Sequence, residues 1–67
     1  MMTIGETLKK EQKELGLSQT KMAGDVLTKS YYSKIERNQY EIKATDLIKI
    51  LRLHDIDVIH FLKILCR

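Results

Sequence analysis

The sequence has no proline, no tryptophan, only three glycines and a single cysteine among its 67 residues. The lone Cys66 cannot form an internal disulfide, and the sequence carries no secretion signal, so we expect a reducing, cytoplasmic compartment. No apolar run approaches the roughly 20 residues that a membrane helix needs, so we expect no association with a membrane. Because apolar residues recur at helical spacing and helix breakers are few, we predict an all-α fold.

Residue types that form catalytic or metal sites are scarce and poorly spaced. His54 and His60 are six residues apart, so they do not share a helix face as metal ligands four residues apart would. Cys66 has no cysteine or histidine at ligand spacing, and neither Ser30 nor Ser33 has a nearby histidine to act as a base. Nothing resembles a glycine-rich phosphate loop. We therefore expect no metal, no cofactor and no enzyme activity.

The length predicts one small domain over residues 1–67, which would bury only ~60% of its unfolded surface. The net charge is +3. Residues 1–17 hold three cations and three acids, residues 18–43 five and three, and residues 44–67 four and three. The cationic excess is therefore largest in the central stretch, as a nucleic-acid surface requires. A mixed, solvated surface explains the charge alone equally well.

Apolar spacing and local end signals predict five helices. We place them at about residues 3–15, 18–26, 29–37, 44–53 (or 45–53) and 58–65. The side chains expected to cap them are Thr3 (in a capping box with Glu6), Ser18, Thr28, Thr45 and Asp57. The left-handed residues expected at helix ends are Gly16, Asn38 and Asp55.

The inward faces of these helices predict the core. The first helix is expected to contribute Ile4, Leu8, Gln12 and Leu15. The next two are expected to contribute Met22, Ala23, Tyr32 and Ile35. The last two are expected to contribute Leu47, Ile48, Ile50, Leu51, Val58, Phe61, Leu62 and Leu65. The loop residues expected to reach the core are Leu17, Ile42 and Ile56.

The stretch SQTKMAGDVLTKSYYSKIERN, residues 18–38, predicts two short helices joined by a tight turn. If Tyr32 and Ile35 point inward, the outer side of the second helix is left with donors and cations and no acid. These outward residues are Lys29, Ser30, Ser33 and Lys34. Such a helix suits the major groove of DNA, where bases and phosphates mostly present acceptors.

These residues also carry a family resemblance. The segments S-Q-x-x-M-A and T-x-S-x-Y-S-K-I-E-R resemble the helix-turn-helix, residues 18–37, of Xre/Cro/phage-repressor DNA-binding domains. Within that group, LSQ-x-x-MAGD, SKIERN and the E-I that follows look most like the Rgg/GadR/MutR transcriptional regulators of Gram-positive bacteria. The resemblance covers about residues 3–65. It implies a five-helix, lambda-repressor-like domain that binds double-stranded DNA. Because one such domain offers few base contacts, we expect weak binding alone, and useful affinity from a two-fold homodimer on a repeated or palindromic site.

The resemblance also implies which residues contact DNA. Gln19 would donate to a phosphate, and Lys29 and Ser30 would reach deepest toward the bases. Because the adjacent Tyr32 points inward, we expect Tyr31 to be exposed and to contact a phosphate or a thymine methyl. The remaining residues would contact bases one helical turn on, or phosphates from the following loop. The full predicted set is Gln19, Thr28, Lys29, Ser30, Tyr31, Ser33, Lys34, Arg37, Asn38, Gln39, Tyr40 and Lys43.

The sequence departs from the wider superfamily at two points. Where that superfamily often has an arginine paired with the glutamate of K-I-E-R, this chain has Gln12, so we predict a Gln12–Glu36 hydrogen bond. The turn of the superfamily usually has one more residue and a glycine. Gly24 comes too early for that role, so residues 24–28, GDVLT, are expected to form the turn.

Two further expectations concern partners. Rgg-type regulators continue into a helical-repeat domain that binds peptide signals and dimerises, so we expect this chain to be an excised domain or a short natural product of such a regulator.

The alternative function is a protein-interaction or dimerisation module of the same fold, with Leu62, Leu65 and Cys66 as its contact patch. RNA binding is a poorer third interpretation, because paired exposed aromatics for base stacking are not evident.

Overall fold

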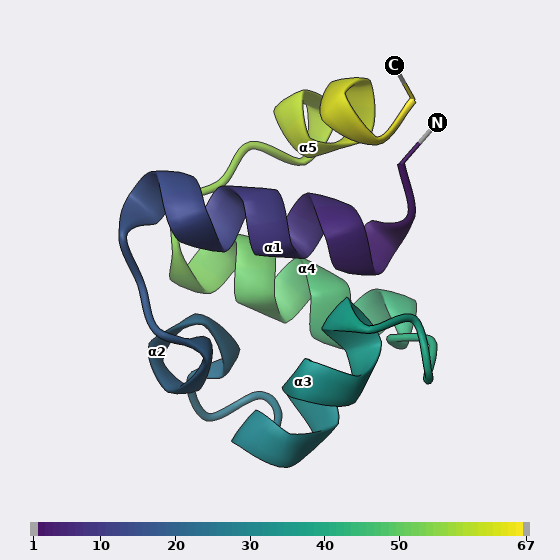
Figure 1. The fold of residues 1–67 in the computed structure, drawn as a ribbon. Helices are drawn as coiled ribbons and strands as arrows, with labels where there is room; N and C mark the ends of the chain where they lie inside the picture. The colour runs from purple at the N-terminus through teal and green to yellow at the C-terminus, as the bar shows by residue number, and fades with distance from the viewer. Residues whose placement is uncertain (1, 67) are drawn as a thin grey trace.

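The structure is a computed structural model that describes residues 2–66, and over this range it contains helices and no strand (Figure 1). The elements are α1 (Ile4–Leu15), α2 (Gln19–Ala23), α3 (Lys29–Glu36), α4 (Ala44–Leu53) and α5 (Val58–Leu65). The predicted all-α, five-helix architecture is therefore confirmed. Across these residues, no helix is long and apolar enough to cross a membrane.

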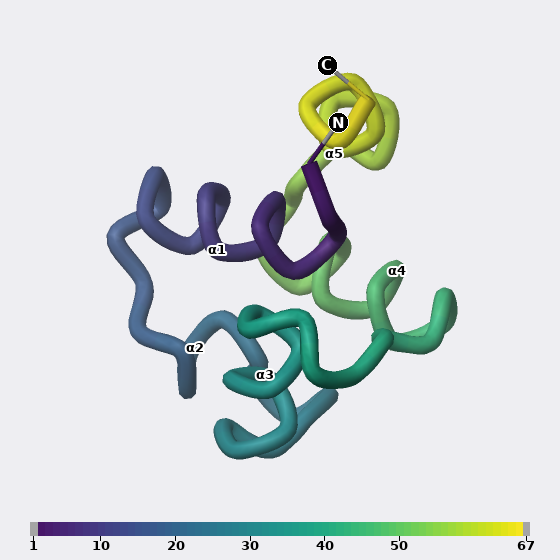
Figure 2. The backbone as a smooth tube through the Cα atoms, turned by 45° about the vertical axis from the view of Figure 1, so that its right-hand side comes forward, coloured from purple at the N-terminus to yellow at the C-terminus, as the bar shows by residue number. Residues whose placement is uncertain are grey.

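Helix α1 runs through the middle of the molecule and contacts both α3 and α5. Helices α2 and α3 lie on one side of it and α5 on the other, in both views (Figures 1 and 2). The two ends of the described chain meet beside α5, where Met2 N donates to the Leu65 carbonyl at 3.1 Å. The α2–α3 pair and α5 are thus separated by α1.

Short-range chemistry explains where most helices begin. Thr3 and Glu6 form the predicted capping box, and hydrogen bonds from the Thr3 backbone and side chain lower the pKa of the Glu6 carboxyl from its usual value. Ser18, Thr28 and Asp57 also accept from backbone N–H groups, as predicted. The predicted Thr45 cap is wrong. Helix α4 begins at Ala44 after Lys43, which makes no side-chain cap, so Thr45 already lies inside the first turn.

The predicted left-handed residues are confirmed at Gly16 (φ 69°), Asn38 (φ 62°) and Asp55 (φ 54°). The predicted turn over residues 24–28 is confirmed, but the predicted end of the second helix at about residue 26 is wrong. Helix α2 ends at Ala23, and Gly24 follows it as the C-cap with φ 56°. The positive φ favours glycine here, whereas the tip of the exposed Leu53 side chain, 2.4 Å from a Cβ built on Gly24, can move aside.

All five helices contribute residues to the core. Its fully buried residues are Leu8, Met22, Ala23, Tyr32, Ile35, Ile50, Leu51 and Phe61. Packed against them in part are Leu17, Val26, Leu27, Tyr31, Ile42, Leu47 and Ile56. The predicted residues of α2 and α3 and the three predicted loop residues are thus placed as expected, and Ile64 is buried in addition.

Several predicted core residues instead lie at the surface. These are Ile4, Leu15, Ile48, Val58 and Leu62, each at least 36% exposed. Gln12 and Leu65 are half-buried. These residues are exposed because the buried face of each helix does not extend to the edges of the predicted apolar stripe. On α1 that face is centred on Leu8 and includes Gly5, Thr7 and Glu11, so the first and last residues of the predicted stripe fall at its edge.

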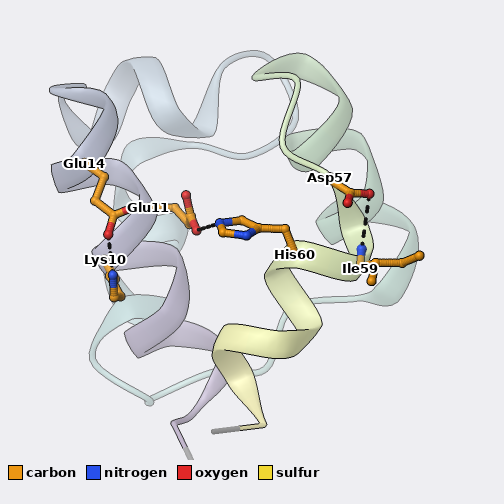
Figure 3. A network of polar contacts seen from close by, with 6 residues as sticks. All are labelled: Lys10, Glu11, Glu14, Asp57, Ile59 and His60. Atoms are coloured by element: carbon orange, nitrogen blue, oxygen red, sulfur yellow. Dashed lines mark hydrogen bonds and ion pairs between the residues drawn. The ribbon is translucent and has the colours of Figure 1, made fainter.

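A polar contact joins α1 to α5. Glu11 of α1 is only 5% exposed, and its Oε1 lies 3.5 Å from Nε2 of His60 on α5 (Figure 3). Lys10 and Glu14 form an ion pair on the solvent side of α1, and Asp57 caps α5 through Ile59 N, both visible in the same view. The helix on the far side of α1 from α3 is therefore held by polar as well as apolar contacts.

Gly5 marks the closest approach of α1 to α3. A Cβ built at this position would lie 2.1 Å from the Ile35 carbonyl oxygen, far inside van der Waals contact. The sequence pattern does not single out this residue, because nothing local in a helical glycine indicates what crosses it. Gly5 therefore sets the spacing between the central helix and α3.

Candidate nucleic-acid interface

One side of helix α3 packs against the core, and part of the opposite side is exposed to solvent. Tyr32 and Ile35 are buried with 0% and 2% exposure, as the spacing of the two residues predicts. Lys29 and Ser30, which open the helix, are exposed, whereas Ser33 and Lys34 one turn later are half-buried. The first turn of α3 is thus the part most open to a large partner.

Most of the twelve predicted contact residues lie on α3 or in the segments at its two ends, and Gln19 begins α2. The exposed members of the set are Thr28, Lys29, Ser30, Arg37, Asn38, Gln39, Tyr40 and Lys43. The half-buried members are Gln19, Tyr31, Ser33 and Lys34. The exposed members therefore form two groups, one at the start of α3 and one in the loop after it.

Gln19 is occupied by a contact within the protein. Its Nε2 donates to Glu36 Oε1 at 2.7 Å, which joins the start of α2 to the end of α3. The predicted Gln12–Glu36 hydrogen bond is therefore wrong. Gln12 Oε1 is buried and accepts no hydrogen bond from residues 2–66. A glutamine lacks the charge and reach of the superfamily's arginine, and the amide of Gln19 takes its place at the carboxylate.

The Gln19–Glu36 contact fixes the orientation of the single acid on α3. The Glu36 carboxylate faces the protein interior, where it lies close to the phenol of Tyr32. Burial, and then the nearby charge of Glu36, raise the pKa of Tyr32, so the phenol stays protonated at physiological pH. The outer side of α3 consequently carries the cations Lys29 and Lys34 with no acid of its own.

The loop after α3 folds back onto the helix. Gln39 N donates to the Lys34 carbonyl at 2.9 Å, and the left-handed Asn38 makes this reversal possible. Arg37 is exposed and its Nε donates to the Ser33 carbonyl at a long 3.4 Å. The loop therefore brings its polar residues beside the outward side of α3 instead of trailing away from it.

Tyr31 is not the freely exposed residue that the sequence predicts. It is half-buried and packs in part against the core. Its Oη donates to the Glu41 carbonyl at 3.3 Å, and its ring stacks on that of Tyr40 with centroids 5.7 Å apart. No local pattern could have revealed this pair, because the two tyrosines meet only once the loop has folded back.

The described part of the chain forms no cluster of metal-ligating side chains. Among residues 2–66, no three His, Cys, Asp or Glu side chains come together as metal ligands. Cys66 is a free, exposed thiol. The cationic side of α3 is chemically suited to an anionic partner that presents acceptor groups.

Comparison with known proteins gives one family. The sequence model of a family described as a helix-turn-helix domain matches residues 5–62, which is most of the chain and includes every residue of α2, α3 and the loop after them. No curated protein matches the chain, and no solved structure matches it either. The matched range includes the surface derived above from burial and charge.

Proposed function

The chain belongs to the helix-turn-helix domain family, and on that premise we propose that it regulates transcription by sequence-specific binding to double-stranded DNA. Domains of this family are typically DNA-binding and not enzymatic. The proposal is supported mainly by the way helix α3 is exposed. Tyr32 and Ile35 of this helix are buried and its one acid points inward. Lys29 and Ser30 are exposed at its first turn.

In the proposed complex, the first turn of α3 enters the major groove. The Lys29 ammonium donates to O6 and N7 of a guanine, and the Ser30 hydroxyl contacts a neighbouring base. Ser33 and Lys34 lie one turn farther along the groove. The start of α2, with Gln19, and the loop over residues 37–43 contact phosphates, which fix the register of the domain without reading sequence.

A single domain of this size offers few base contacts, so we propose that useful affinity requires a two-fold dimer on a repeated or palindromic site. The support is an exposed apolar strip on α5. It consists of Val58, Ile59 and Leu62, which are 41–62% exposed. The sequence resemblance further supports a bacterial, cytoplasmic regulator of the Rgg/GadR/MutR type, with any peptide signal read by a separate domain.

The same apolar strip supports a second candidate function. Here the chain is a protein-interaction or dimerisation module that keeps the helix-turn-helix fold without binding DNA. Such a chain would use α5 as its contact surface and leave the α3 cations as ordinary solvated charges. Of the patch predicted from sequence, Leu62 and Cys66 are exposed and Leu65 is half-buried.

The two functions separate in a selection experiment. The purified chain is mixed with a pool of random duplexes at two salt concentrations, and the bound fraction is sequenced. We expect one enriched motif, repeated or palindromic, with an affinity that falls steeply as salt rises because counterions are released from the phosphates. Binding that is absent at both salt concentrations would contradict the proposal and favour the interaction module.

A further inference from the structure

We propose that Tyr40 is a positioning residue for Lys34, and that it acts through its ring and not through its hydroxyl. In this arrangement Tyr31 holds the Tyr40 ring against α3, and the ring holds the Lys34 ammonium at the DNA-facing side of the helix. The inference rests on the proposed function, because it concerns how a cation of the reading surface is presented.

Two residues of α3, Tyr31 and Lys34, both contact Tyr40 in the loop that follows the helix. The rings of Tyr31 and Tyr40 are stacked, with 5.7 Å between centroids and 22° between planes. Nζ of Lys34 lies 5.3 Å from the centroid of the Tyr40 ring. Tyr31 Oη also donates to the carbonyl of Glu41, the residue after Tyr40, so a hydrogen bond fastens the loop next to the stacked rings.

The distance between Lys34 and the ring lies within the range of a cation–π interaction. The ring attracts the ammonium by its quadrupole but does not neutralise the charge, and it occupies only one side of the group. The other N–H donors of Lys34 remain available to a phosphate or a base. Tyr40 therefore offers Lys34 a partner in the free protein that does not compete with DNA for its charge.

The contact also lowers the cost of binding. A lysine side chain has many rotamers, and immobilising it at an interface costs free energy that the bound complex must recover. A side chain already held on a ring has lost part of that freedom before DNA arrives. Tyr40 should thus increase affinity even if it makes no contact with DNA of its own.

A double-mutant cycle tests this role. Affinities are measured by fluorescence anisotropy, on a labelled duplex carrying the motif enriched from the random pool, for the wild type, Tyr40→Leu, Lys34→Met and the double variant. We expect Tyr40→Leu to lower affinity about threefold to tenfold. In the Lys34→Met background the same change should have little further effect, because the partner of the ring is already gone.

Two variants separate the contribution of the ring from those of the hydroxyl and of the net charge. Tyr40→Phe keeps the ring and removes the hydroxyl, so it should recover most of the affinity that Tyr40→Leu loses. Lys63→Met removes one positive charge from α5, on the far side of α1 from α3, and should not alter the effect of Tyr40→Leu (Figure 1). Melting temperatures of all variants show whether any loss of affinity reflects loss of fold.

Proton NMR of the free chain tests the contact between Tyr40 and Lys34 in the absence of DNA. In the free chain, the ring current of Tyr40 should shift the proton resonances beside the Lys34 ammonium. Tyr40→Leu should abolish that shift, and Tyr40→Phe should retain it. Equal affinity of wild type and Tyr40→Leu, full additivity in the cycle, or a Tyr40→Phe chain as weak as Tyr40→Leu would each overturn the inference alone. A wild type that binds no duplex would overturn the proposed function and the inference with it.

Discussion

Alanine at both Lys29 and Lys34 is expected to weaken binding to the enriched duplex about 100-fold and to leave the fold intact. Each lysine–base contact that is lost is worth roughly 1–3 kcal/mol of discrimination, and about 1.4 kcal/mol corresponds to a factor of ten. Neither side chain belongs to the core, so stability should change little. Fluorescence anisotropy on the enriched duplex and on a scrambled one gives the affinity and the loss of specificity together.

The matched control for the Lys29 and Lys34 double variant removes two positive charges from helices other than α3. Lys49 lies on α4 and Lys63 on α5, and both are exposed. Alanine at these two positions should weaken binding only by the small, sequence-independent factor that follows from a lower net charge. Equal losses for the two double variants would mean that the net charge, and not the outer side of α3, determines binding. An unchanged affinity after replacement of Lys29 and Lys34 would reject this reading surface.

Gly5→Ala is expected to destabilise the domain by about 2–3 kcal/mol, which is the upper range for overpacking a close contact. The new Cβ would lie 2.1 Å from the Ile35 carbonyl oxygen, and backbone cannot move aside as a flexible side chain could. Alanine gains only about 1 kcal/mol of helix propensity over glycine, so the clash outweighs it. For a domain of this size the melting temperature should fall by roughly 10–20 °C.

Gly16→Ala provides the comparison. Gly16 has φ 69° and no heavy atom within 4 Å of a Cβ built on it, so alanine there meets strain without a clash. The cost should be about 1–2 kcal/mol, below that at Gly5. Thermal unfolding followed by circular dichroism measures both variants. A Gly5→Ala chain that melts at or above the wild-type temperature would show that α1 and α3 do not approach as closely as described.

The features of this fold that could be predicted from sequence are the ones determined by neighbours along the chain. Thr3 with Glu6, and Thr28 before a helical run, are capping signals whose partners lie within three residues. Gly16 and Asn38 are recognisable because few residues other than glycine and asparagine accept a left-handed conformation. The boundaries of α1, α3 and α5, and with them the outward side of α3, follow from such local chemistry.

The features that could not be predicted depend on which elements meet in space. Ile48 has apolar spacing on its helix, but it is 42% exposed because no neighbour among the described residues covers that edge of α4. The Gln19–Glu36 contact depends on a turn whose path the sequence does not reveal. The same holds for the Tyr31–Tyr40 stack, which forms only after the loop has reversed. The spacing of apolar residues predicts which side of a helix is buried. How many residues on that side are buried depends on the elements that pack against it.

One measurement tests most directly whether α3 is the reading element. Amide NMR spectra of the isotope-labelled chain are recorded during titration with the enriched duplex, and shifted resonances are mapped onto the structure. We predict that the largest changes fall on Lys29, Ser30, Lys34 and the loop over residues 37–43, and that amides of α5 move little unless the chain dimerises on the DNA. Changes confined to α5 and the end of α4, with α3 unaffected, would contradict the proposed reading surface.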